Sequence, residues 1–226
     1  MRHKKKYSRR AIQLNAFTNS KLPIAEQYRQ IRTNIQFSSV DQEIKSIMIT
    51  SPESGDGKST TAANLAIVFA QQGKPVLLVD TDLRIPSVHF PFNVSNMNGL
   101  TSVLTKKISL EHAINNTFIP NLSILTSGDI PPNPSELLSS KSMGKLMEEL
   151  KGKYEYIIYD TPPMLAVTDP QIIANKCDGV VMVVLSGKTQ KEHALKAKEL
   201  LESAKSRLLG VVVNGVESSN KEYYYV

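Results

Sequence analysis

Short, uniformly apolar runs alternate along this chain with longer segments whose apolar residues recur every three or four positions. Runs without alternating polar residues are typical of strands that are buried on both faces of a parallel sheet. The expected strands span residues 45–50, 75–80, 121–126, 156–160, 180–184 and 208–214. The expected helices span residues 24–37, 61–72, 135–151 and 188–203, with short helices at 99–104 and 109–114. This alternation predicts an α/β fold, with a doubly wound, mostly parallel sheet and helices on both faces.

The helix expected at residues 24–37 carries two stripes. The apolar stripe consists of Ile24, Tyr28, Ile31 and Ile35, which recur at helical spacing. Glu26, Arg29 and Arg32 follow one another at three-residue intervals and form a charged stripe. Two interpretations stay open for the charged stripe: a solvated face on a helix that docks against the domain, or a contact surface for a neighbouring subunit.

Length and composition indicate one α/β domain with short appendages. With 226 residues, 41% of them hydrophobic, the chain can bury a full core, and its apolar runs are too short to span a membrane. We expect a basic, flexible segment at residues 1–22, the folded domain at 23–216 and a tail at 217–226. The single cysteine, Cys177, excludes an internal disulfide and fits a cytoplasmic protein.

The positive charge is concentrated at the start of the chain. Residues 1–10 contain six basic residues and no acidic one, which accounts for the whole formal net charge of +6. Such a segment could bind an anionic membrane surface or nucleic acid, or it could be a solvated terminus. The charge-balanced remainder gives no indication of a nucleic-acid-binding body.

The stretch from Ser51 to Thr60 has the features of a phosphate-binding loop (P-loop). It follows an apolar run, precedes an expected helix and contains Gly-Lys-Ser-Thr at residues 57–60, although Pro52 stands where the usual motif has its first glycine. Glycines let the backbone turn its N–H groups toward an anion, and the helix N-terminus adds more. We expect nucleotide phosphates to bind at Ser54, Gly55, Asp56, Gly57, Lys58, Ser59 and Thr60.

Four polar side chains stand at the carboxyl ends of expected strands, which border the ligand crevice in an open α/β sheet. They are Asp80 and Asp82 near the end of strand 75–80, Asp160 at the end of strand 156–160, and Asn214 at the end of strand 208–214. Asp160 matches the Walker-B pattern, an apolar strand that ends in aspartate. Asn214 could hydrogen-bond an adenine edge, although asparagine is also a common turn residue.

Together these residues predict a phosphoryl-transfer site that uses ATP and Mg²⁺. Lys58 would neutralise the β- and γ-phosphates, while Ser59 and Asp82 would hold Mg²⁺ and Asp160 would order or join its coordination shell. Asp80 would accept or position the proton of an incoming hydroxyl group. Because the transition state is loose, placement and charge neutralisation matter more than a strong base.

Three of the eight tyrosines, Tyr223, Tyr224 and Tyr225, are consecutive near the end of the chain. Two interpretations are open: a tail without a function of its own, or a tail that offers hydroxyl groups to a phosphoryl-transfer site. Phosphorylation would add about −1.5 to −2 charges to each tyrosine, so neighbouring sites would repel one another.

From about residue 24 to its end the chain resembles the bacterial tyrosine kinases (BY-kinases) of capsule and exopolysaccharide systems. Six features carry the resemblance in this order: the Glu26-Arg29-Arg32 helix, the P-loop, the acidic motif 76–84, the segment 131–138, the strand and turn at 156–163, and the terminal tyrosines. The resemblance implies a P-loop kinase domain that transfers the γ-phosphoryl group of ATP to tyrosine, mainly on the terminal cluster of a neighbouring subunit.

The resemblance also implies partners. In the Gram-positive form of the family the kinase is a separate cytoplasmic chain, recruited to the plasma membrane by the cytoplasmic tail of a transmembrane adaptor. The Glu26-Arg29-Arg32 helix implies a ring-like homo-oligomer that phosphorylation of the tail disassembles. A cognate tyrosine phosphatase and protein substrates in polysaccharide synthesis are further expected partners, whereas nucleic acid is not.

The competing interpretation is a ParA/MinD-like positioning ATPase, which shares the expected fold and the acidic motifs. Those proteins carry a signature lysine near the start of the P-loop, where this chain has Glu53, and they lack the tyrosine tail. A structural or nucleic-acid-binding module would leave Lys58, Asp80, Asp82 and Asp160 unexplained.

Overall fold

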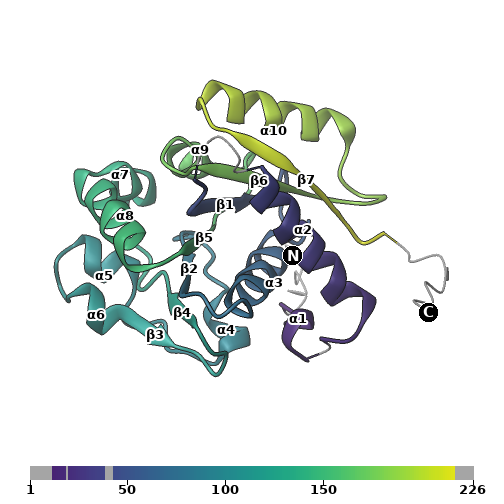
Figure 1. Cartoon of the computed structure of the whole chain (residues 1–226). Coiled ribbons are helices and arrows are strands. Elements are labelled where there is room, and N and C mark those ends of the chain that lie inside the picture. Colours follow the sequence, from purple (N-terminus) through teal and green to yellow (C-terminus); the bar gives the residue numbers. More distant parts are fainter. Residues whose placement is uncertain (1–11, 19, 39–42, 217–226) are drawn as a thin grey trace, which may run out of the picture.

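The computed structural model describes residues 12–18, 20–38 and 43–216, and Figure 1 shows how its elements are arranged. Within these residues one seven-stranded sheet has the order β3-β4-β2-β5-β1-β6-β7. The strands are β1 (Ser46–Thr50), β2 (Val76–Asp80), β3 (Ile114–Asn116), β4 (Leu122–Leu125), β5 (Tyr156–Asp160), β6 (Gly179–Leu185) and β7 (Leu208–Asn214). Neighbouring strands are parallel, except that β3 pairs antiparallel with β4. The predicted mostly parallel sheet is confirmed.

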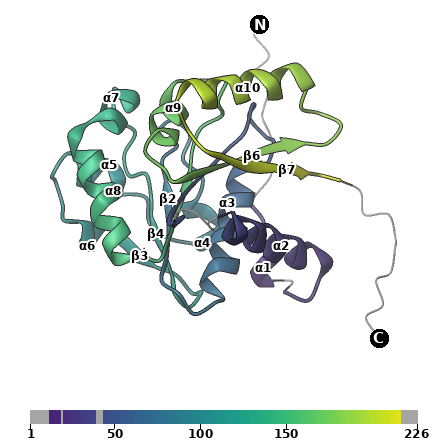
Figure 2. The ribbon, with the colours of Figure 1, turned by 45° about the horizontal axis from the view of Figure 1, so that its top comes forward.

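Helices cover both faces of the sheet (Figures 1 and 2). The longer ones are α2 (Pro23–Phe37), α3 (Lys58–Ala70), α8 (Lys141–Lys153) and α10 (Lys191–Ser203). The short ones are α1 (Asn15–Thr18), α4 (His89–Phe92), α5 (Leu100–Leu104), α6 (Leu110–Ala113), α7 (Pro134–Ser139) and α9 (Asp169–Ala174). No helix of the described ranges is long and apolar enough to cross a membrane.

Two hydrophobic cores, one on each face, explain the uniformly apolar strands. In β1, Ile47 and Ile49 pack in the core that contains α1 to α4, while Met48 packs in the core that contains α5 to α10. All three side chains are fully buried. A strand that is covered on both faces has no solvent-facing position, so its sequence shows no alternation of polar residues.

The structure differs from the sequence-based expectation in its short elements. The helix expected at 135–151 is divided into α7 and α8, because Ser140 has an extended backbone and caps α8, its Oγ accepting a hydrogen bond from the Met143 N–H at 3.2 Å. Ser135, in the first turn of α7, donates its hydroxyl hydrogen to Asp169 Oδ1 at 2.6 Å. Strand β3 and helices α4 and α9 were not expected.

The segment at residues 12–18 was expected to be part of the flexible stretch 1–22, but it packs against the domain. Ala16 in α1 is fully buried, and its N–H donates to Asn64 Oδ1 at 2.8 Å. The amide of Asn64 also donates to the carbonyl oxygens of Gln13 at 2.7 Å and Thr60 at 2.8 Å. One buried asparagine in α3 therefore fastens the start of the described chain to the helix that follows the P-loop.

We expect Asn64→Ala to lower the free energy of unfolding by about 2 kcal/mol, because it leaves the buried N–H of Ala16 without its partner and removes the contact with Gln13. Urea denaturation followed by far-UV circular dichroism measures this change. Asn34→Ala, at an exposed position of α2, is the matched control and should change stability by less than about 0.5 kcal/mol. Equal stability of the two variants would show that residues 12–18 do not depend on Asn64.

Candidate active site

The P-loop connects the carboxyl end of β1 to α3 and is shaped by two glycines in left-handed conformations. Gly55 has a φ of 85° and Gly57, the N-cap of α3, a φ of 101°. A side chain at Gly57 would also collide with Asn214, whose Nδ2 lies 2.1 Å from the position of a Cβ. The N–H groups of Ser54, Gly55 and Gly57 donate to no other residue that the structure describes. Such free N–H groups above a helix N-terminus fit an anion such as phosphate.

Lys58, the first residue of α3, lies among carboxylates and not in solvent. Its Nζ is 3.3 Å from Asp82 Oδ2, 3.5 Å from Asp160 Oδ1 and 3.1 Å from the hydroxyl oxygen of Ser59. Burial lowers the pKa of this ammonium, but the charges of Asp160, Asp82 and Asp80 outweigh burial and raise it. Lys58 is therefore held as a cation at the centre of the site.

The sheet itself brings Asp80 and Asp160 together, since they are the paired last residues of the adjacent parallel strands β2 and β5. Asp80 is fully buried and its carboxylate accepts hydrogen bonds from the N–H groups of Asp82, Ser87 and Val88, each at 3.1 Å. Burial, together with the charges of Asp160 and Asp82, raises the pKa of Asp80 to about 7. A carboxyl group with this pKa can exchange a proton near neutral pH.

Asp160 offers the clearest indication of a cation site. Both of its carboxylate oxygens are buried, and the groups beside them are the Lys58 ammonium, 3.5 Å from Oδ1, and the Ser59 side chain. Burial raises its pKa, although Lys58 and Ser59 oppose this effect. Ser59 and Asp82 supply further oxygen atoms beside it, a hydroxyl and a carboxylate, which are the ligand types that Mg²⁺ prefers. The residues expected to hold Mg²⁺ therefore fit this ion.

Other expected nucleotide-binding residues support the P-loop from its outer side. Asn214 Nδ2 donates to the carbonyl oxygen of Asp56 at 3.1 Å, so here its amide binds the loop, and its role toward adenine stays a prediction. The Asp56 carboxylate is buried, and its Oδ2 accepts the N–H of Glu53 at 3.1 Å. Thr60 is half-buried in the first turn of α3.

Two groups of residues around the site were not assigned by the sequence. Arg84 binds Asp169 of α9 with two nitrogen atoms, at 2.8 and 3.1 Å, and so ties the acidic loop after β2 to the helix that follows β5. Lys188, after β6, donates to the carbonyl oxygen of Ser54 at 3.0 Å. The position of Lys188 just beyond the carboxyl end of a strand was the signal that could have identified it.

The charged stripe of α2 lies apart from these residues. Arg29 contacts Glu26 Oε2 at 2.8 Å, and Arg32 donates to the carbonyl oxygen of Val68 at 2.7 Å. Glu26 is the most exposed of the three, with 72% of its side chain accessible. The tyrosines at 223–225 lie outside the described residues, so their placement is not part of this site.

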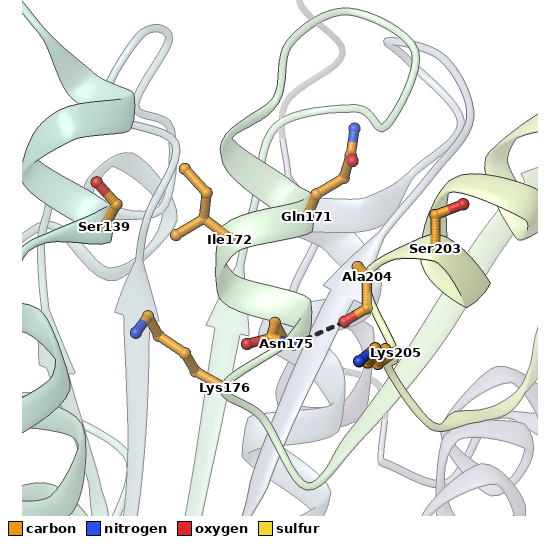
Figure 3. Close-up of a pocket in the computed structure, with 8 residues that line it drawn as sticks. All are labelled: Ser139, Gln171, Ile172, Asn175, Lys176, Ser203, Ala204 and Lys205. Carbon is orange, nitrogen blue, oxygen red and sulfur yellow. Dashed lines mark hydrogen bonds between the residues drawn. The ribbon is translucent and has the colours of Figure 1, made fainter.

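A separate cavity of about 510 Å³ lies between α7, α9 and the end of α10 (Figure 3). Its lining includes Asn175, Lys176 and Lys205, which precede β6 and β7 and thus stand at the amino ends of these strands. Asn175 Nδ2 donates to the carbonyl oxygen of Ala204 at 2.8 Å. Because the P-loop follows the carboxyl end of β1, this cavity is not the nucleotide site.

Known proteins resemble this chain in both sequence and structure. Residues 44–205 match the family model described as an AAA domain. The chain is 56% identical over 223 residues to the tyrosine-protein kinase YwqD of Bacillus subtilis, covering 98% of this chain and 94% of that protein. The crystal structure of the chimerical protein CapA2B2 matches with a TM-score of 0.87 and 44% identity, covering 90% of this chain and 89% of that chain.

Two more distant structures bear on the choice between a tyrosine kinase and a MinD-like ATPase. The kinase domain of the Escherichia coli tyrosine kinase ETK has a TM-score of 0.88 and 33% identity, covering 100% of this chain and 87% of that chain. The septum site-determining protein MinD of Pyrococcus horikoshii, complexed with Mg-ADP, reaches 0.66 and 27%, covering 78% of this chain and 72% of that chain. The similarity to MinD is thus a similarity of the P-loop ATPase fold. The relatives that cover most of this sequence are named tyrosine-protein kinases. The chain belongs to the bacterial tyrosine-protein kinases.

Proposed function

We propose that this chain transfers the γ-phosphoryl group of ATP to Tyr223, Tyr224 and Tyr225 in the tail of a neighbouring copy. The observation that carries the proposal is the cluster at the carboxyl ends of β1, β2 and β5. There a cationic lysine, free N–H groups and a carboxyl group with a pKa of about 7 lie together. These are the parts that a phosphoryl-transfer site requires.

Each residue of the cluster has a distinct part in the proposed reaction. The N–H groups of Gly55 and Gly57 bind phosphate oxygens, and the Lys58 ammonium neutralises the charge on the transferred group. Asp80 accepts the proton of the tyrosine hydroxyl group as the oxygen–phosphorus bond forms. The bond between the β- and γ-phosphates breaks, and ADP leaves.

Ser59, Asp82 and Asp160 would hold Mg²⁺, which when bound neutralises phosphate charge and orients the phosphates. Asp82 is well placed to keep its orientation, because its Oδ1 accepts the Ile85 N–H at 3.0 Å while Oδ2 faces Lys58. The buried carboxylate of Asp160 would hold the ion or its water ligands.

The proposal extends to partners. The match to the chimerical protein CapA2B2 supports activation by the cytoplasmic tail of a membrane adaptor, which would recruit the chain to the inner face of the plasma membrane. The relatives named CapB and CpsD support a role in capsule or exopolysaccharide synthesis. We propose further that α2 joins copies into a ring through Glu26, Arg29 and Arg32, that tail phosphorylation opens the ring, and that a tyrosine phosphatase reverses it.

Lys58→Met should abolish tail phosphorylation, with a loss of at least about 10²-fold in rate, because the charge on the transferred group is no longer neutralised. Intact-mass spectrometry after incubation with Mg-ATP and a peptide from a candidate adaptor tail measures this loss. Lys74→Met is the matched control, since Lys74 pairs with Glu155 at the other end of β2. Wild-type levels of phosphotyrosine in Lys58→Met would refute the site. ATP hydrolysis by the wild type without phosphotyrosine would favour a MinD-like ATPase.

A mixing experiment tests transfer between copies. We expect a chain in which Tyr223, Tyr224 and Tyr225 are all replaced by Phe to phosphorylate the tail of the Lys58→Met chain, because one supplies the active site and the other the hydroxyl groups. A mass tag on one chain identifies the product in the same mass spectrum. Each chain alone is the control and should gain no tail phosphate. If the mixture also gains none while the wild type does, transfer occurs within one copy.

The rate of phosphotransfer should rise with pH through about 7, since only the deprotonated carboxylate of Asp80 accepts a proton and its pKa is held at about 7. Initial rates at saturating Mg-ATP between about pH 5.5 and 8.5 measure this profile, with up to about a tenfold loss per pH unit on the acidic side. Binding of Mg-ADP over the same range is the control that separates affinity from chemistry. A flat rate profile would remove Asp80 as the proton acceptor.

A further inference from the structure

Asp56 places a negative charge inside the loop that the proposed function assigns to phosphate. Its side chain is fully buried, Oδ2 accepts the Glu53 N–H at 3.1 Å, and the Thr189 side chain also hydrogen-bonds the carboxylate. Burial raises the pKa of Asp56, while the Glu53 N–H, the charge of Lys188 and the Thr189 side chain oppose this effect. A carboxylate in this position repels phosphate unless a cation balances it.

Lys188 supplies a cation beside the carboxylate of Asp56. It lies in the loop between β6 and α10, and its Nζ is 3.6 Å from Asp56 Oδ1. The same ammonium donates to the Ser54 carbonyl oxygen at 3.0 Å and would lie 3.2 Å from a Cβ at Gly55. Lys188 thus touches the P-loop on the side opposite to Lys58, and the two lysines come from different elements.

The contact with Ser54 has a consequence for the backbone. In a trans peptide the C=O and the next N–H point in opposite directions. Since the Ser54 carbonyl oxygen is held outward by Lys188, the N–H of Gly55 faces the inner side of the loop, and this N–H donates to no described residue. Asn214 has the same effect two peptides further on, because it holds the Asp56 carbonyl oxygen and so turns the Gly57 N–H inward.

We propose that Lys188 is a positioning residue for the nucleotide: its ammonium balances the buried carboxylate of Asp56 and fixes the Ser54 peptide so that the P-loop accepts phosphate. This inference rests on the nucleotide site of the proposed function, but it concerns affinity for the nucleotide and not the transfer step. The Lys188 side chain is half exposed, so a substitution at this position creates no cavity in the hydrophobic core.

Isothermal titration calorimetry with Mg-ADP, on the full chain, tests the proposal. Lys188→Met should weaken binding about tenfold, whereas Lys188→Arg, which keeps the charge and the donors, should stay within about threefold of wild type. Adding Asp56→Asn to Lys188→Met should restore most of the lost affinity, because no unbalanced carboxylate then remains. Lys191→Met is the matched control at an exposed lysine three residues away and should bind as wild type.

The outcomes are separable from those of the kinase proposal, because Mg-ADP binding needs no phosphoryl transfer. Wild-type affinity in Lys188→Met would overturn the inference, and so would a loss that Asp56→Asn does not relieve. The thermal unfolding midpoint of Lys188→Met should equal that of wild type. If instead this midpoint is lowered and Lys188→Arg binds Mg-ADP as weakly as Lys188→Met, the role of Lys188 is structural and the inference is overturned. Absence of phosphotyrosine in the wild type would refute the kinase proposal and leave this result intact.

Discussion

The ammonium of Lys58 is what allows three aspartates to lie together inside this domain. Asp80 and Asp160 are fully buried and Asp82 is 5% exposed, and a group of buried carboxylates is unstable without a cation and hydrogen-bond donors. Lys58 supplies the cation at 3.3 and 3.5 Å from two of them, while backbone N–H groups of residues 82–88 serve the third. The order of the strands creates this constraint, because β5 lies between β1 and β2 and brings the P-loop beside both acidic strand ends.

The same constraint explains why the chemistry lies on one edge of the sheet. Five parallel strands end on this edge beside loops that serve the site: the P-loop after β1, the acidic loop after β2, Asp160 in β5, Lys188 after β6 and Asn214 in β7. Lys188 and Asn214 bind carbonyl oxygens of the P-loop. Ser59, Asp82 and Asp160 surround the ammonium of Lys58. The free N–H groups of the P-loop are therefore fixed by side chains that are far apart in the sequence.

The sequence was sufficient for the long elements and for the central residues, and the reason is physical. Uniformly apolar strands and the Gly-Lys-Ser-Thr turn are local patterns, so β1, β2, β5, β6 and β7 and the grouping of Lys58 with Asp82 and Asp160 followed from them. Contacts between distant segments leave no such pattern. Burial of Ala16 depends on Asn64, the break at Ser140 separates two packed helices, and Lys188 acquires its role only when β6 lies beside β1.

The structure also bears on why a fold shared with MinD supports a kinase. The interpretation as a positioning ATPase expects a lysine where this chain has Glu53. Here Glu53 Oε1 lies 3.2 Å from His193 Nδ1 of α10 in the same chain, so this side chain faces its own domain. Lys188 already places a cation beside the loop, with its Nζ 3.6 Å from Asp56 Oδ1. Both lysines that contact the P-loop or its aspartates, Lys58 and Lys188, thus come from one copy, so the proposed transfer would need a second copy for its tyrosine hydroxyl groups and not for a cation.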